Sequence, residues 1–381
     1  MFTDAIESRH NCPIPQKKGK PKSETKSYRP VSLLPTLGKI LEKLLLERLN
    51  FPFWTNNLQA ANKYGFTVNK SSEGAIVDFI DETEMTRSTK QHALVISLDI
   101  KGRQVALNTP QGPATLPQHG GCPQGSCTDP AFWNLVANEV LAQSWPEGVH
   151  LQAFADDFIF LIKALTKAKV KSLANEALNQ FKSWTAKHNL EISADKSNYM
   201  HFNKNRNGPR WSAGIRWEGN LLKRKLSIKY QGVFIDDKLN FATHLSELKN
   251  KTLNLYQKIK SIAASNWGLN KNIRRKIYFT VIERILLYGV PAWANNITSR
   301  QQRLLNSIQR KFLLNITGAY STSPTTALQV IEGITPLHIK AQMESILVRV
   351  GRLRRDCNWE GSSFFKSGFS ATKFSSYHSS S

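Results

Sequence analysis

Residues 150–162 read His-Leu-Gln-Ala-Phe-Ala-Asp-Asp-Phe-Ile-Phe-Leu-Ile, so that two apolar runs flank the acidic pair Asp156 and Asp157. Short apolar runs of this composition are typical of buried strands. We therefore expect a β-hairpin with a buried body and the two acids at its turn. Two carboxylates there can hold a metal ion, although a lone Asp-Asp between hydrophobic runs is usually a solvated turn.

A third acid follows another buried run. Residues 93–98, Ala-Leu-Val-Ile-Ser-Leu, predict a strand at the centre of a sheet, and Asp99 comes directly after them. A rigid strand fixes a carboxylate while the next loop leaves room for substrate, so an acid in this position is often catalytic. The simpler alternative is an Asp that ends a strand in a turn.

The composition indicates a globular chain with a polyanionic partner. The 381 residues and 40% hydrophobic content suit two or three domains with real cores. The 52 Lys and Arg against 28 Asp and Glu leave a formal charge of +24, which favours nucleic acid ahead of an acidic membrane surface. No apolar run can span a bilayer and residues 1–20 lack a signal-peptide core, so we expect an intracellular protein, nuclear or cytoplasmic.

The four cysteines are too few for a disulfide scaffold. Cys122 and Cys127, with His119, could serve as zinc ligands, but no second pair with suitable spacing completes such a site. We favour small residues in a glycine-rich loop, residues 103–126, which is followed by a helix expected at 129–143. This loop matches neither the Walker pattern nor Gly-x-Gly-x-x-Gly, so it predicts no nucleotide motif by itself.

Helical periodicity recurs along the chain. The expected helices cover residues 37–49, 72–87, 169–189, 244–263, 271–288 and 299–316. The last three, basic on their outer faces, predict a separate helical lobe. Its cations form either a phosphate track or plain solvated faces, and we expect a mixture: Arg274, Arg275, Lys276, Arg303, Arg310 and Lys311.

Two tryptophans stand in a basic stretch before this lobe. Trp211 and Trp217, followed by Lys223, Arg224 and Lys225, would suit stacking on bases or sugars. The commoner outcome is a β-hairpin in which both tryptophans belong to the core.

A series of short motifs adds a family resemblance. In chain order they are Tyr28-Arg-Pro-Val-Ser-Leu-Leu34, Tyr64-Gly-Phe66, Leu98-Asp-Ile-Lys-Gly102, Gly121-Cys-Pro-Gln-Gly-Ser126, Phe154-Ala-Asp-Asp157, Leu190-Glu-Ile-Ser193 with Lys196, Tyr230-Gln-Gly-Val233 and Leu287-Tyr-Gly289. This order resembles the reverse transcriptases of non-LTR retrotransposons of the LINE type, jockey-like ones included. The resemblance runs from about residue 13 to 350.

The resemblance implies an α+β fold of the right-hand polymerase kind, with fingers, palm and thumb, an antiparallel palm sheet and a helical C-terminal lobe. On this basis residues 1–90 are expected to form an N-terminal arm and fingers, and 91–238 the palm. Residues 239–355 are then the thumb and connection, and 356–381 a disordered tail.

The activity implied is copying of an RNA template into DNA from a DNA primer with deoxynucleoside triphosphates. The aspartates matching Asp99, Asp156 and Asp157 would bind two Mg²⁺ ions, with Mn²⁺ as a substitute, because hard cations prefer oxygen ligands. Two such ions clamp an in-line displacement between the primer hydroxyl and the leaving pyrophosphate. Lys196 resembles the palm lysine near the leaving group, a proton donor.

The same resemblance assigns further contacts. Gln124 and Gly125 correspond to the loop that packs under the templating pair. Tyr230 and Gly232 belong to the segment that resembles the primer grip. Arg29 and Lys70 would face the incoming nucleotide or the template from the fingers.

One departure from the family pattern bears on activity. After Gly102 the family continues with Ala-Phe-Asp and several dozen residues of helix, whereas Arg103 follows here. Missing packing of that size predicts exposed apolar surface or a poorly anchored strand before Asp99. A truncated element or a spliced gene model would both give this gap.

Three functions therefore stay open. The first is a reverse transcriptase able to extend a primer. The second is a catalytically inactive, truncated retrotransposon remnant that only binds nucleic acid. An unrelated two-metal nuclease or phosphatase is disfavoured, because the sequence holds no dense His/Asp cluster beyond the three acids.

Overall fold

The computed structural model describes residues 10–15, 28–33, 36–55, 59–100, 103–109, 112–118, 129–205, 211, 213–263, 269–359 and 362–365. The chain forms two compact units. The first comprises residues 1–75 and 82–228, and the second comprises residues 76–81 and 229–381. The finer division into fingers, palm and thumb stays a prediction.

A six-stranded sheet is the centre of the first unit. Its strands, in order across the sheet, are β12 (Lys223–Arg224), β9 (Asn198–Phe202), β4 (His92–Asp99), β8 (Asp157–Ala164), β7 (Val149–Phe154) and β3 (Lys63–Tyr64). The four inner strands pair antiparallel, while both edge strands run parallel to their neighbours. The fold is therefore mixed α/β with a mixed sheet, and the expectation of an antiparallel sheet was wrong at the edges.

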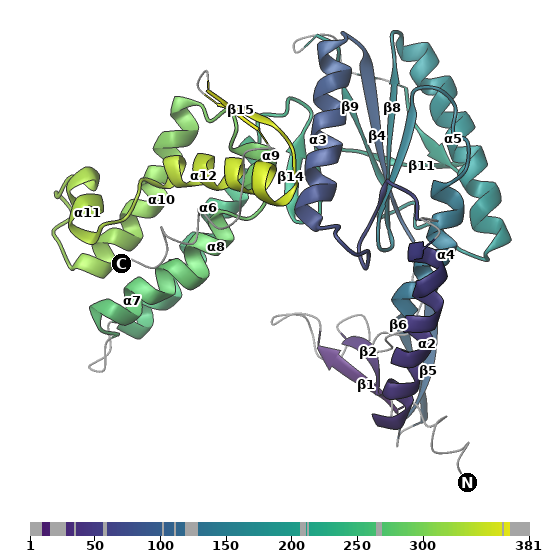
Figure 1. Cartoon of the computed structure of the whole chain (residues 1–381), viewed down its shortest axis with the longest axis horizontal. Helices are drawn as coiled ribbons and strands as arrows, with labels where there is room; N and C mark the ends of the chain where they lie inside the picture. Colours follow the sequence, from purple (N-terminus) through teal and green to yellow (C-terminus); the bar gives the residue numbers. More distant parts are fainter. Residues whose placement is uncertain are drawn as a thin grey trace. The chain divides into compact units, whose positions relative to one another are not determined.

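Helices cover both faces of this sheet (Figure 1). On one face lie α4 (Asp129–Leu141) and α5 (Lys167–Lys187). There Phe158 and Phe160 of β8 meet Phe181 of α5, with ring centroids 5.2 and 5.4 Å apart. The other face carries α3 (Ser72–Ser88), whose Glu82 pairs with Lys163 at 2.6 Å. Burial on both faces explains why the central residues of β4 and β8 are almost all apolar.

The helix boundaries follow local capping chemistry. The Ser71 side chain accepts a hydrogen bond from Gly74 N at the start of α3, and Thr166 accepts one from Lys169 N at the start of α5. The cap of α3 is thus Ser71, and Glu73 lies in the first turn. Both helices were predicted within two residues of their observed starts.

Helix α2 (Thr36–Thr55) is longer than predicted and leaves its apolar stripe uncovered. Leu37 is 66% exposed and Leu44 56% exposed, and the other exposed members are Ile40, Leu41 and Leu45. Exposed apolar surface was one of the two consequences predicted from the departure after Gly102, and its connection with α2 stays a prediction. Two hairpins complete the N-terminal half: β1 (His10–Pro15) with β2 (Tyr28–Leu33), and β5 (Arg103–Thr109) with β6 (Gly112–Gln118).

The tryptophans of the basic stretch are core residues. Trp211 is 2% exposed, and Trp217 on the hairpin β10 (Arg216–Trp217) and β11 (Asn220–Leu221) is 4% exposed. The Trp217 ring lies 6.0 Å from the ring of Phe181. Rings buried in this way are not available for stacking on bases.

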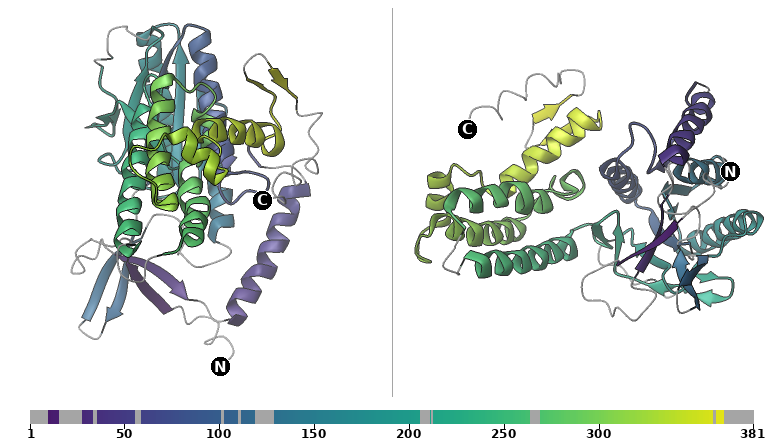
Figure 2. Two further views of the ribbon diagram at one scale, coloured as in Figure 1. Left: turned by 90° about the vertical axis from the view of Figure 1, so that its left-hand side faces the viewer. Right: turned by 90° about the horizontal axis from the view of Figure 1, so that it is seen from below.

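The second unit is mostly helical. Its elements are β13 (Ser227–Tyr230), β14 (Val233–Asp236), α6 (Ala242–Ala263), α7 (Lys271–Ile277), the π-helical η2 (Tyr278–Ile282), α8 (Glu283–Leu286), α9 (Val290–Trp293), α10 (Ser299–Thr317), α11 (Thr325–Glu332), α12 (Leu337–Ile346) and the π-helical η3 (Leu347–Arg352). α10 packs against α6, α7, α11 and α12 (Figure 2). The helix expected at 271–288 is broken by the π turn.

A small hairpin of β15 (Cys357–Trp359) and β16 (Ser362–Phe364) lies in the range expected to be a disordered tail. Residues beyond 365 lie outside the described part of the chain. Among the described helices, none combines the length and the apolar character that a bilayer crossing requires.

Candidate active site

The acidic pair lies at the turn of the β7–β8 hairpin, as predicted. Phe154 pairs with Asp157, so Ala155 and Asp156 form the connection between the strands. Ala155 has φ +52°, a left-handed conformation that costs an L-residue about 1–2 kcal/mol. Strained backbone of this kind concentrates at functional sites.

The third acid is level with the hairpin. Asp99, the last residue of β4, pairs directly with Asp157 of β8. Residues opposite each other in an antiparallel pair have Cβ atoms about 4.5–5.5 Å apart on the same face of the sheet. The structure therefore brings Asp99 and Asp157 together, with Asp156 adjacent to Asp157 in the turn.

The backbone of Asp99 is hydrogen-bonded to the segment that precedes β9. Its backbone N–H donates to Ser197 Oγ at 3.1 Å, and its carbonyl accepts from Ser193 N at 2.8 Å. β4 is hydrogen-bonded to β8 and to β9 along its length. The expectation of a poorly anchored strand before Asp99 was wrong, because β4 lies in the middle of the sheet.

Lys196 belongs to the same site. Its Nζ lies 3.3 Å from Asp99 Oδ2 and the side chain is 59% exposed. This is an ion pair without hydrogen-bond geometry, since Asp99 Oδ2 is buried and has no hydrogen-bond partner among the described residues. The Lys196 ammonium offsets part of the charge on this carboxylate, while Oδ2 accepts no hydrogen bond from the described residues.

The donor set fits a hard divalent cation. In the described part of the chain, no three His, Cys, Asp or Glu side chains converge as a metal-binding group. Mg²⁺ does not need such a cage, because it is usually held by one or two carboxylates together with substrate phosphates and water. Asp99, with its unsatisfied Oδ2, and the neighbouring Asp157 satisfy that requirement.

The motif Tyr64-Gly-Phe66 lies against the acidic turn. Ala155 N donates to Tyr64 O at 3.3 Å. Gly65 has φ +76°, and a Cβ on it would come within 2.8 Å of Ala155 N. Only glycine permits this approach, because a side chain would push the turn away.

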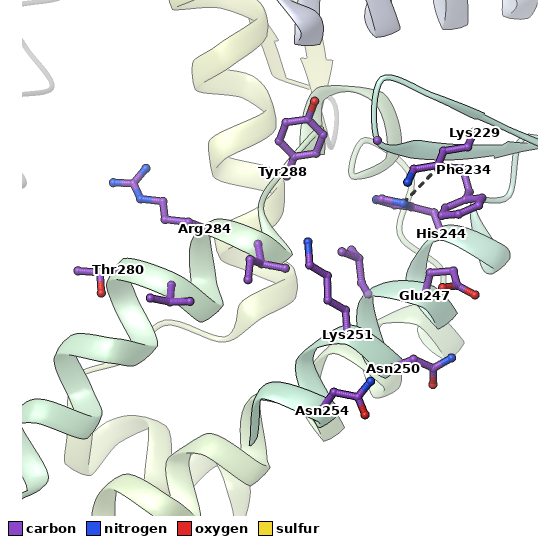
Figure 3. Close-up of a pocket in the computed structure, with 14 residues that line it drawn as sticks. Lys229, Phe234, His244, Glu247, Asn250, Lys251, Asn254, Thr280, Arg284 and Tyr288 are labelled. Carbon is purple, nitrogen blue, oxygen red and sulfur yellow. Dashed lines mark hydrogen bonds between the residues drawn. The ribbon is translucent and has the colours of Figure 1, made fainter. Parts of the chain in front are cut away.

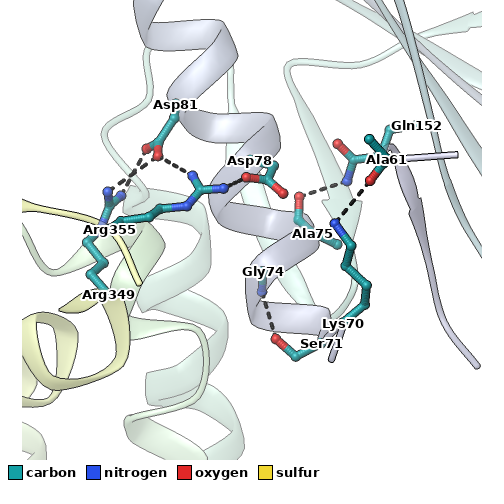
Figure 4. Close-up of polar contacts among 10 residues, drawn as sticks. All are labelled: Ala61, Lys70, Ser71, Gly74, Ala75, Asp78, Asp81, Gln152, Arg349 and Arg355. Atoms are coloured by element: carbon teal, nitrogen blue, oxygen red, sulfur yellow. Dashed lines mark hydrogen bonds and ion pairs between the residues drawn. The ribbon is translucent and has the colours of Figure 1, made fainter. Parts of the chain in front are cut away.

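Lys70 and Arg29, the two cations that the resemblance assigns to the fingers, lie on different elements. Lys70 Nζ donates to Ala61 O at 3.1 Å and lies 4.9 Å from the centroid of the Tyr64 ring (Figure 4). Arg29 lies on β2 opposite Ile14, and its side chain is outside the described set. Their contacts with nucleotide or template stay predictions. Gln124 and Gly125 lie outside the described residues, as do His119, Cys122 and Cys127.

In the second unit, two distant motifs meet. Gln231 and Gly232 have φ of +44° and +86° and form the turn of the β13–β14 hairpin. Tyr288 Oη donates to Gln231 O at 2.7 Å, and a Cβ on Gly232 would lie 3.0 Å from the Tyr288 ring. Tyr230 is 4% exposed and its ring lies 5.7 Å from that of Phe79. Tyr230 is therefore a packing residue, whereas the turn after it is the exposed part.

A pocket of about 830 Å³ lies beside this hairpin (Figure 3). Its lining includes the cations Lys229, Lys251 and Arg284. His244, 2% exposed, accepts from Phe234 N through Nδ1 at 3.4 Å, and burial lowers the pKa of His244 to about 4. The neutral imidazole therefore keeps its proton on Nε2, which has no partner among the described residues.

Other cations of the helical lobe are structural. Arg274 donates to the carbonyls of Leu269 and Asn315, and Arg310 donates to those of Ser321 and Ser323. Guanidinium groups used in this way satisfy the free carbonyls of helix ends and loops. These two arginines therefore fit neither of the two predicted roles, phosphate track or plain solvated face, and the roles of the other cations of this lobe stay predictions.

Two residues at the site were missed by the sequence reasoning. Trp133 Nε1 donates to Ala155 O at 2.7 Å, and Asn134 Nδ2 donates to Phe66 O at 2.9 Å. The available signal was a tryptophan next to an asparagine in a helix that follows a glycine-rich loop. Neither residue type in a helix indicates contacts with segments 22 and 68 residues away in the sequence.

Comparison with known proteins identifies a family for part of the chain. Residues 105–235 match the family described as "Reverse transcriptase (RNA-dependent DNA polymerase)". The matched range contains Asp156, Asp157 and Lys196 and begins after Asp99. The chain contains a reverse transcriptase domain.

Its homologues are proteins of R1 and jockey elements, which are non-LTR retrotransposons. The "Putative 115 kDa protein in type-1 retrotransposable element R1DM" of Drosophila melanogaster is 26% identical over 362 residues, covering 87% of this chain and 35% of that protein. The "RNA-directed DNA polymerase from mobile element jockey" of the same species is 24% identical over 344 residues, covering 80% and 37%. The chain thus spans about a third of the length of these curated relatives.

Proposed function

We propose that this reverse transcriptase domain is the polymerase part of a non-LTR retrotransposon protein and copies an RNA template into DNA by extending a primer. The observation that carries the proposal is the direct pairing of Asp99 with Asp157 at the ends of two central strands, with Lys196 beside them. The names of the jockey and R1 relatives support the same reaction.

The mechanism follows from these side chains. Asp99, Asp156 and Asp157 would hold two divalent ions, Mg²⁺ or Mn²⁺, which supply Lewis-acid activation of the primer 3′-hydroxyl and neutralise charge on the leaving pyrophosphate. Lys196, exposed and 3.3 Å from Asp99 Oδ2, can reach the triphosphate and give a proton to the leaving group. The rigid sheet holds the carboxylates in place for this step.

Nucleic acid is the expected partner. The formal charge of +24 and the cations of the pocket, Lys229, Lys251 and Arg284, favour binding of a phosphate backbone. The turn at Gly232 would contact the primer. Arg29, Lys70, Gln124 and Gly125 keep their proposed roles at the nucleotide and the template.

A second candidate function is nucleic-acid binding without catalysis. The family match begins at residue 105, directly past the junction of Gly102 with Arg103. The departure from the family pattern after Gly102 lies three residues from Asp99, and a loss of packing there would favour loss of activity.

Primer extension separates the two. Purified chain is incubated with an RNA template, an annealed DNA primer, deoxynucleoside triphosphates and Mg²⁺, alongside Asp156→Ala and the control Asp195→Ala, whose acid is 96% exposed. We expect extension by wild type and control, and none by Asp156→Ala. If wild type does not extend, or Asp156→Ala extends equally, the polymerase proposal is wrong, and salt-dependent RNA binding then supports the second function.

A further inference from the structure

The peptide groups on both sides of Ala155 are held by hydrogen bonds from two different elements. Trp133 Nε1 of α4 donates to Ala155 O at 2.7 Å, and Ala155 N donates to Tyr64 O at 3.3 Å. Trp133 is 7% exposed, and its ring meets Phe158 edge-on at 6.4 Å. The orientation of the turn before Asp156 is therefore determined by groups outside the hairpin.

The same helix holds the segment that carries Tyr64. Asn134 Nδ2 donates to Phe66 O at 2.9 Å, and Lys63 Nζ donates to Asn134 O at 2.5 Å. One turn later, Asn138 Oδ1 accepts from Ala60 N at 2.7 Å. Positions 134 and 138 lie on one face of a helix, so this face of α4 binds residues 60–66 through hydrogen bonds at two successive turns.

These contacts hold a strained residue. Without them Ala155 would relax from φ +52°, because the left-handed conformation is unfavourable by about 1–2 kcal/mol for a residue with a Cβ. Any relaxation at Ala155 rotates the peptide that leads into Asp156. An enzyme rate is sensitive to such a change, since a misplacement of about 1 Å can cost on the order of 10²-fold.

We infer that Trp133 is a positioning residue for the acidic turn: its indole N–H keeps Ala155 in the left-handed conformation and so sets the direction in which Asp156 leaves the hairpin. This inference rests on the proposed function. It gives α4 a role in metal binding through Trp133, which is not itself a ligand. The competing explanation is that Trp133 only fills the core and satisfies its own N–H.

A double-mutant cycle distinguishes the two explanations. Trp133→Phe keeps a ring and removes the donor; we expect kcat for primer extension to fall about tenfold, with an unchanged KM for primer-template, because a buried carbonyl loses its partner. Ala155→Gly makes the left-handed conformation free of strain. In that background we expect the Trp133→Phe loss to shrink to about threefold or less, whereas a core-filling role predicts the same loss in both backgrounds.

Metal binding supplies a readout that does not depend on activity. Mn²⁺ is titrated into each variant and free ion is followed by electron paramagnetic resonance. We expect Trp133→Phe to raise the Mn²⁺ dissociation constant about threefold or more, since a displaced acid coordinates less well. The matched control is Trp145→Phe, which removes an indole donor to Val140 O on the same face of the sheet and should leave both measurements unchanged.

The outcomes are separable. If wild type does not extend primers, the polymerase proposal fails while the Mn²⁺ titrations still decide the inference. Three results would overturn the inference about Trp133. The first is equal kcat and Mn²⁺ dissociation constants for Trp133→Phe and Trp145→Phe, and the second is a kcat loss from Trp133→Phe that is as large in the Ala155→Gly background as in wild type. The third is no Mn²⁺ binding by wild type. If Trp133→Phe does not fold, Gly65→Ala tests the same turn, because the new Cβ would meet Ala155 N, whereas Trp133 contacts Ala155 O. A Gly65→Ala variant with the kcat and the Mn²⁺ binding of wild type would refute the inference.

Discussion

Lys63 is a buried lysine whose ammonium is held by a backbone carbonyl, and replacing this residue should change how stability depends on pH. The residue is 2% exposed, and Nζ donates to Asn134 O at 2.5 Å. Burial lowers the pKa of Lys63 to about 7. Removing the amine in Lys63→Met abolishes the titration while keeping a long apolar stem.

The sign and size follow from linkage. Between a folded pKa of about 7 and an unfolded value of 10.5, the unfolded chain binds more protons, so the Lys63 contribution to stability rises with pH. At about 1.4 kcal/mol per pKa unit, the wild type should gain about 2–3 kcal/mol from pH 6 to pH 9 that Lys63→Met does not gain. Relative to wild type, the variant is therefore most stable at pH 6.

The assay is urea denaturation of wild type and Lys63→Met at pH 6, 7.5 and 9, followed by tryptophan fluorescence. Differences between the two proteins cancel the contributions of all other titrating groups. Lys171→Met, at an exposed position on α5, serves as the control and should give a constant difference across pH. A constant difference for Lys63→Met as well would refute the reasoning that the ammonium is desolvated at this position.

Further substitutions test the second unit and the nucleic-acid surface. Gly232→Ala should lower the urea midpoint, with a loss of about 1–2 kcal/mol, because φ is +86° and the new Cβ meets the Tyr288 ring at 3.0 Å. Asp81→Asn should destabilise the second unit by about 2 kcal/mol in the same assay, since it weakens the contact to the buried Arg349 at 3.1 Å (Figure 4); an unchanged midpoint would contradict this. Lys251→Gln should weaken binding to a primer-template and reduce the slope of log K against log salt by about one, and an unaltered slope would remove this lysine from the binding surface.

Local patterns determined most of the secondary structure. The β7–β8 hairpin, the strand before Asp99 and the helices α3, α5, α6 and α10 were predicted close to their observed bounds, because alternation and helical periodicity record which side chains are buried. The π turn at Tyr278–Ile282 was not predicted, since its apolar pattern still reads as a helix. The motif series also determined the family.

Tertiary structure decided how these parts meet. Strand order and register place Asp99 opposite Asp157. They also bring Trp133 to the Ala155 carbonyl and Lys70 to Ala61. Burial of Trp211 and the exposure of Leu37 likewise depend on which neighbours are present, because periodicity marks an apolar face without saying what covers it. The sequence therefore determined which acids this domain carries, and only the pairing of β4 with β8 decided that they form one site.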